Sequence, residues 1–164
     1  MARMTSRGEL PLPGKLTVRA GHRKVVLAKR AWESERHVLL KALVFSLYVA
    51  RYPELAVERA IGERYKPDLV ALDADGQPLL WAECGETGRQ KLEYLIKALP
   101  GTHLVVAKQV ASIAPHTAVI ETAVAKGKRS APVELLNFPP DASRFLGEDG
   151  GITIGFADVT LVRF

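Results

Sequence analysis

The chain has 164 residues, 48% of them hydrophobic, and a formal net charge of +5. This length suits one domain with its own hydrophobic core, and the ordinary apolar content excludes a generally disordered chain. Cys84 is the only cysteine, which excludes an internal disulfide and cysteine-rich zinc sites and suits a reducing compartment such as the cytoplasm.

The sequence predicts neither a membrane span nor a secretory signal. The most apolar stretch, residues 38–50, contains Lys41 and is shorter than the roughly 20 residues that a transmembrane helix needs. Residues 1–14 carry charged side chains without an apolar segment, so we expect a flexible leader there and a single domain over residues 15–164. We therefore expect a cytoplasmic protein with no membrane partner.

Positive charge is concentrated in the first quarter of the chain. Residues 1–41 contain ten Lys and Arg against three Asp and Glu, whereas the remainder contains thirteen against fifteen. One interpretation is a face that binds nucleic acid, either DNA or RNA. A solvated hairpin with a basic tail explains the same charges equally well. The candidate nucleic-acid-binding residues are Arg19, Arg23, Lys24, Lys29 and Arg30.

Apolar periodicity and turn signals predict an α/β domain with a mixed sheet. Ser34 is a typical N-cap for the first helix, and Thr87 with Gln90 has the spacing of a capping box at the second. In chain order, we expect a basic hairpin of residues 15–20 and 23–29, a largely buried helix over 35–51, a hairpin of 68–73 and 79–84, a helix over 87–99, a strand over 103–107, a helix over 113–126, a strand over 133–138, and a closing hairpin of 152–156 and 159–164.

The second of these hairpins carries two carboxylates. A two-residue turn at Asp75-Gly76 would place Asp68 directly opposite Glu83, and likewise Leu72 opposite Leu79. Opposed side chains have Cβ atoms roughly 4.5–5.5 Å apart, so two carboxylates there repel one another unless a cation lies between them. Oxygen ligands of this kind suit Mg²⁺ or Mn²⁺. Two alternatives stay open: the pair lies in water at the end of the sheet, or a longer loop shifts the register.

Further charged residues flank this pair in the sequence. Glu35 shares a helix face with Leu39 and Ala42, which would bring a third carboxylate to the rim of the core, although Glu33 could take the same place. Arg89 and Lys91 begin the second helix, close after Glu83. A cation there could hold an attacking water or stabilise a phosphorane-like transition state.

The order of these residues resembles that of the PD-(D/E)XK nuclease superfamily, and within that group the chain is similar to the YaeQ family. The resemblance extends from Lys15 to Arg163. Besides the two terminal hairpins, it rests on Ser34-Glu35 through Leu43, Pro67-Asp68-Leu69 and Trp81-Ala82-Glu83-Cys84-Gly85.

The resemblance implies a restriction-endonuclease-like α/β fold, with a mixed central sheet flanked by helices, an N-terminal basic hairpin and a C-terminal hairpin. It also implies a nuclease site in which Mg²⁺ or Mn²⁺ is bound by Asp68, Glu83 and the backbone carbonyl of Cys84, with Glu35 as a further ligand and catalytic residue. The superfamily's lysine would stand at Gly85. Lys91 is therefore the first candidate for the catalytic cation, and Arg89 is the second.

Three functions are compatible with this reasoning. The first is a metal-dependent nuclease acting on DNA or RNA. The second is a catalytically silent module that keeps the fold and binds nucleic acid or a protein, and the third is an enzyme acting on a small phosphorylated substrate. The four histidines have no ligand spacing and no serine has the context of a nucleophile, so zinc hydrolase and Ser/His/Asp chemistry are not expected.

Overall fold

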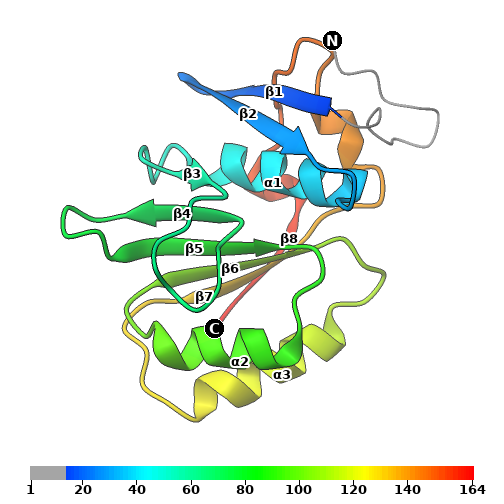
Figure 1. Cartoon of the computed structure of the whole chain (residues 1–164). Coiled ribbons are helices and arrows are strands. Elements are labelled where there is room, and N and C mark those ends of the chain that lie inside the picture. Colours follow the sequence, from blue (N-terminus) through cyan, green and yellow to red (C-terminus); the bar gives the residue numbers. More distant parts are fainter. Residues whose placement is uncertain (1–13) are drawn as a thin grey trace.

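The computed structural model describes residues 14–164, so the leader expected at residues 1–14 lies outside the described residues except for Gly14. Figure 1 shows the arrangement of the elements. In chain order they are β1 (Gly14–Ala20), β2 (Arg23–Lys29), α1 (Glu35–Tyr48), β3 (Ala56–Val57), β4 (Leu69–Leu72), β5 (Pro78–Cys84), α2 (Arg89–Ala98), β6 (His103–Lys108), α3 (Ala114–Ala125), β7 (Val133–Asn137), the 3-10 helices η1 (Ala142–Phe145) and η2 (Phe156–Asp158), and β8 (Thr160–Arg163).

Six strands form one mixed sheet in the order β3-β4-β5-β6-β7-β8, and β1 pairs with β2 in a separate antiparallel hairpin. Strands β5, β6 and β7 run parallel, joined by α2 and α3 as crossover helices. Strands β4 and β8 are antiparallel to their neighbours. The predicted α/β class with a mixed sheet flanked by helices is confirmed.

The sheet separates two hydrophobic cores. Helix α1 and the β1-β2 hairpin lie on one face of the sheet, and α2 and α3 cover the other (Figure 1). Side chains of β5 alternate between the two: Ala82 and Cys84 pack in the α1 core, whereas Trp81 packs in the α2-α3 core. Over residues 14–164, no helix is long and apolar enough to cross a membrane.

Helix α1 begins as predicted, and α2 does not. The Ser34 side chain accepts a hydrogen bond from the backbone N–H of His37 at 3.1 Å, and α1 is buried on most sides before it ends at Tyr48. The capping box predicted at Thr87 and Gln90 is wrong, because Gly88 occupies the N-cap position of α2 and offers no side-chain acceptor. The Thr87 hydroxyl is buried without a hydrogen-bond partner among the described residues.

The second hairpin has the predicted register in its middle, where Val70 pairs with Trp81. Towards the turn the prediction is wrong: the backbone N–H of Asp73 donates to the carbonyl of Gln77, so the loop is longer than two residues. A bulge then pairs Leu72 with Pro78 instead of Leu79.

The prediction of a C-terminal hairpin from residues 152–156 and 159–164 is also wrong. Ile152 makes only an isolated bridge, with Leu146, and residues 156–158 form the short helix η2. Strand β8 instead pairs with β7 at the edge of the main sheet, which extends the α/β layer by one antiparallel strand.

Candidate functional site

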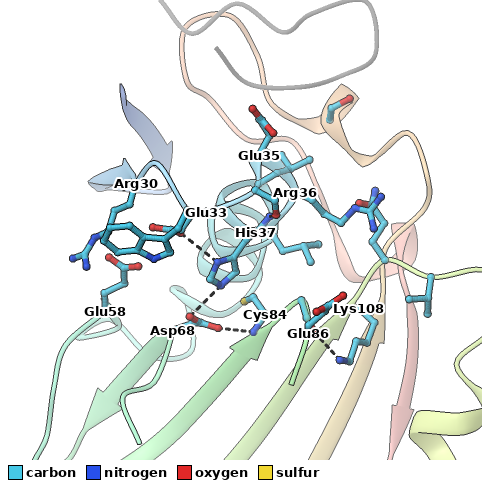
Figure 2. A pocket seen from close by; sticks show the side chains of 18 of the residues that line it. Arg30, Glu33, Glu35, Arg36, His37, Glu58, Asp68, Cys84, Glu86 and Lys108 are labelled. Carbon is cyan, nitrogen blue, oxygen red and sulfur yellow. Dashed lines mark hydrogen bonds and ion pairs between the residues drawn. The ribbon is translucent and has the colours of Figure 1, made fainter. Parts of the chain in front are cut away.

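A cleft of about 1030 Å³ opens at the ends of β5 and β6, between the sheet and the N-terminus of α1. Figure 2 shows its side chains, which come from segments far apart in the sequence. The charged ones are Arg30, Glu33, Glu35, Arg36, Glu58, Lys66, Asp68, Glu86 and Lys108, with His37 and His116 beside them. Because carboxyl ends of neighbouring parallel strands meet at one edge of a sheet, this is a common place for a binding site in α/β proteins.

A chain of polar contacts runs across the cleft from α1 to β5 (Figure 2). The His37 ring lies between two carboxylates, with Nδ1 3.2 Å from Oε2 of Glu33 and Nε2 3.2 Å from Oδ1 of Asp68. The other oxygen of Asp68 accepts a hydrogen bond from the backbone N–H of Cys84 at 2.8 Å. The contact with Asp68 raises the pKa of His37. Burial alone would raise the pKa of Asp68, but the bonds from His37 and Cys84 outweigh it and lower that pKa.

Behind this chain of contacts, Lys41 forms a buried ion-pair cluster. Its Nζ lies 2.7 Å from Oε2 of Glu33 and 2.6 Å from Oε1 of Glu58, and its side chain is fully buried. Burial would lower the pKa of Lys41, but its bonds to the two carboxylates outweigh that effect and raise it. The lysine that interrupts the apolar sequence of α1 therefore compensates two carboxylates of the cleft wall.

Glu83 lies on the other face of β5 and does not line the cleft. Its Oε1 accepts a hydrogen bond from the Trp81 indole at 2.8 Å, and its Oε2 accepts one from Nζ of Lys91 at 2.8 Å. The expectation that Glu83 and Asp68 face one another is wrong, because Trp81 and Lys91 hold Glu83 towards α2 while His37 holds Asp68 towards α1. Burial, and then repulsion from Asp68, raises the pKa of Glu83.

The two principal carboxylates predicted to bind the metal are thus held by protein partners. Both oxygens of Asp68 and both of Glu83 accept from donors of the chain, and Glu35 lies 4.0 Å from Nζ of Lys29. Within residues 14–164, no three His, Cys, Asp or Glu side chains are grouped as ligands of one metal ion. In this arrangement the donor set does not fit Mg²⁺ or Mn²⁺, and metal ligation by these residues stays a prediction.

The two candidates for the catalytic cation differ in position. Lys91 reaches Glu83, as the sequence suggested, and its Nζ lies 5.3 Å from the centre of the Tyr65 ring. Arg89 pairs with Glu93 one helical turn away, and its side chain is largely exposed. Of the two, only Lys91 contacts a predicted site residue.

The basic residues predicted to bind nucleic acid divide into two groups. Arg23 donates to the backbone carbonyls of Pro53 and Leu55, and Lys29 is buried beside Glu35, so these two support the fold. Arg19, Lys24 and Arg30 are exposed, and Arg30 lines the cleft.

Three functional candidates were not found from the sequence. His37 is one residue among four histidines, and only the fold brings it to Asp68. Lys108 ends the buried strand β6 and donates to the carbonyl of Gly85 at 2.6 Å. Trp32 is 77% exposed at the cleft, and the Arg30 guanidinium lies beside its ring. The only sequence feature that could have indicated a role for Trp32 is a tryptophan next to basic residues.

Comparisons with known proteins identify a fold. No family model matches the sequence, and a search of curated proteins finds no match. Two crystal structures of YaeQ proteins are similar in structure. The one from Pseudomonas syringae has a TM-score of 0.60 and 18% identity, with 91% of each chain covered. The one from Xanthomonas axonopodis pv. citri has a TM-score of 0.57 and 16% identity, covering 80% of this chain and 75% of the other. The chain therefore has the fold of the YaeQ proteins.

Proposed function

We propose that this protein binds nucleic acid in the cleft, with backbone phosphates at the basic side chains and a base on Trp32. The supporting observation is an asymmetry in charge pairing. Among the five cleft carboxylates, Glu33, Glu58 and Asp68 each contact Lys41 or His37, and Glu35 lies 4.0 Å from Nζ of Lys29. Only Glu86 has no basic side chain within 4.0 Å in the part of the chain that the structure describes. By contrast, four cleft cations have no carboxylate within 4.0 Å among residues 14–164: Arg30, Arg36, Lys66 and Lys108. Four unpaired cations against one unpaired carboxylate favour a polyanionic ligand.

Trp32 adds a surface on which a base can stack. Its side chain is 77% exposed, and the Arg30 guanidinium lies 5.4 Å from the centre of its ring. Proteins that bind single strands combine a basic groove with exposed aromatic rings, because every base offers a face for stacking. A single-stranded ligand is therefore favoured over a duplex, whose bases are already stacked.

We also infer that the chain is a member of the YaeQ family with a restriction-endonuclease-like core. Support comes from the order α1, β3, β4, β5, α2, β6, which matches the α-β-β-β-α-β arrangement that the resemblance implies. A cytoplasmic location suits the buried free thiol of Cys84.

A metal-dependent nuclease is the second candidate, favoured by one observation. The Asp68 carboxylate accepts a hydrogen bond from the backbone N–H of Cys84, the residue after Glu83, and Lys91 is bonded to Glu83. Cleavage by this site requires that His37 and Lys91 release the two carboxylates to the metal. An assay with Mg²⁺, Mn²⁺ and EDTA on single- and double-stranded DNA and RNA tests it. Cleavage that needs the metal and is abolished in Asp68→Asn and Glu83→Gln supports this candidate, and cleavage that survives both substitutions refutes the site.

Binding itself is tested by fluorescence anisotropy with labelled single- and double-stranded oligonucleotides at several salt concentrations. The double variant R36A/K66A removes two exposed cleft cations, and K97A/K126A removes two exposed lysines at α2 and α3, on the other face of the sheet. We expect affinity to fall steeply with salt and in R36A/K66A, and to stay near wild type in K97A/K126A. Equal losses in both double variants would mean that the cleft is not the binding surface.

A further inference from the structure

Lys108 is a buried cation on the floor of the cleft. It is the last residue of β6 and only 4% exposed. Its Nζ donates one hydrogen bond, at 2.6 Å, to the carbonyl of Gly85 (Figure 2). Within the described chain, no carboxylate lies within 4.0 Å of this ammonium group.

An ammonium group in this position is incompletely satisfied. It has three donors, and the described part of the chain supplies an acceptor for one of them. Burial lowers the pKa of Lys108, while the charges of Glu86 and Glu83 act in the opposite direction from a distance. A buried charge without a close partner is destabilising to the fold. An anionic ligand that binds in the cleft would supply the partner that the folded chain does not.

Lys41 is the internal comparison. It is also buried beside the cleft, yet two carboxylates lie within 2.7 Å of its Nζ. The same fold thus compensates one buried lysine completely and leaves the other with a backbone carbonyl. The second arrangement keeps donors of Lys108 available to the cleft.

The backbone next to Lys108 leaves room for a ligand. Gly85 has a φ of +80°, a conformation that side chains rarely adopt, and a Cβ added there would meet only Cδ2 of His37, at 3.8 Å. The backbone at Gly85 therefore has no side chain between it and the cleft. Lys108 from the neighbouring strand brings an ammonium group to its carbonyl oxygen.

We propose that Lys108 is the centre of a phosphate-binding subsite on the cleft floor, where its ammonium donates to a phosphate oxygen. The inference rests on the proposed function and deepens it, because it names the group of the nucleic acid that enters deepest. The same chemistry suits the phosphate of a small phosphorylated molecule, so the test includes both sources.

Lys108→Met is the main variant, because it keeps the length of the side chain and removes the charge. Lys97→Met, at an exposed position of α2, is the control. We expect inorganic phosphate to raise the melting temperature of the wild type and of K97M above that in sodium chloride of equal ionic strength. In K108M we expect no such rise, an affinity for a single-stranded oligonucleotide about tenfold lower, and a salt slope reduced by about 0.7.

Stability without phosphate separates a ligand-binding role from a structural one. Removal of an unpaired buried charge predicts that K108M melts at or above the wild-type temperature in chloride. If Lys108 served only to stabilise the fold through its bond to Gly85, K108M would melt at a lower temperature than the wild type in chloride and would keep its response to phosphate. That result would refute the proposed phosphate subsite.

The outcomes for the subsite and for the proposed function are distinguishable. Oligonucleotide binding that is unchanged in K108M overturns the subsite and leaves the function standing. A Lys108-dependent response to phosphate without binding of any oligonucleotide supports the subsite and refutes nucleic acid as the ligand. If K108M does not fold, acetylation of the wild type, followed by mass spectrometry, decides: protection of Lys108 but not Lys97 by phosphate supports the subsite, and equal modification with and without phosphate overturns it.

Discussion

The Nε2 atom of His37 lies 3.2 Å from Oδ1 of Asp68, which joins the first turn of α1 to the start of β4. On its other side the same ring contacts Glu33. The imidazole of His37 thus lies between two carboxylates of the cleft, one of which, Asp68, is predicted to bind a metal ion. Four of the five cleft carboxylates lie within 4.0 Å of a basic side chain, whereas Glu86 has no such partner among residues 14–164. Four cleft cations are likewise unpaired there and are left for an anionic ligand.

This contact predicts a pH-dependent contribution of His37 to stability. The folded state raises the pKa of His37 above its unfolded value, so the contribution is complete below about pH 6.5 and is lost as the pH rises through the folded-state pKa. Urea unfolding should therefore show a larger difference between wild type and His37→Gln at about pH 6 than at about pH 9. His22→Gln, at an exposed turn, is the control and should show no such trend. A difference that grows with pH would contradict the ion pair.

Lys41 should be the charged residue on which folding depends most. Lys41→Met leaves the carboxylates of Glu33 and Glu58 without their shared partner, and breaking a buried pair in this way costs about 3–5 kcal/mol. Equilibrium urea unfolding measures the loss. The triple variant K41M/E33Q/E58Q removes the uncompensated charges as well and should recover part of it. A loss below about 1 kcal/mol in K41M would mean that the cluster contributes little.

Cys84 should be chemically inert in the folded protein. The thiol is fully buried, and burial raises its pKa well above the usual value, so little thiolate forms near neutral pH. We expect a thiol reagent to label the native protein slowly at about pH 8 and to label one thiol per chain at once in denaturant. Rapid labelling of the native protein would show that the end of β5 opens readily.

Local patterns were sufficient to predict most of the fold. Ser34 caps α1 as its side-chain chemistry requires, and Gly21-His22 joins two strands that pair as predicted. One error arose where longer-range packing decided: nothing in residues 159–164 indicates that β8 pairs with β7 at the edge of the main sheet. The others were local, at the turn after Asp73 and at the N-cap of α2.

The site was harder to predict because its contacts cross between elements. Strand pairing placed Asp68 in line with Glu83, but alternation alone cannot say which partner each carboxylate takes. His37 and Lys91 decide that, and both come from helices whose rotation about their axes the sequence specifies only roughly. The strand predicted over residues 103–107 ends one residue before Lys108, and only the place of Lys108 beside Gly85 gives it a candidate function.

The central claim, that the cleft binds nucleic acid, is tested most directly by tryptophan fluorescence. The chain has two tryptophans, and Trp81 is fully buried whereas Trp32 is 77% exposed, so a quencher such as iodide reports on Trp32 alone. A single-stranded oligonucleotide should change the emission, protect Trp32 from iodide and lose affinity as salt rises. Trp32→Phe should keep most of the affinity, and Trp32→Ala should lose about 1–3 kcal/mol of binding free energy. An oligonucleotide that leaves Trp32 fully accessible to iodide at low salt would contradict the account.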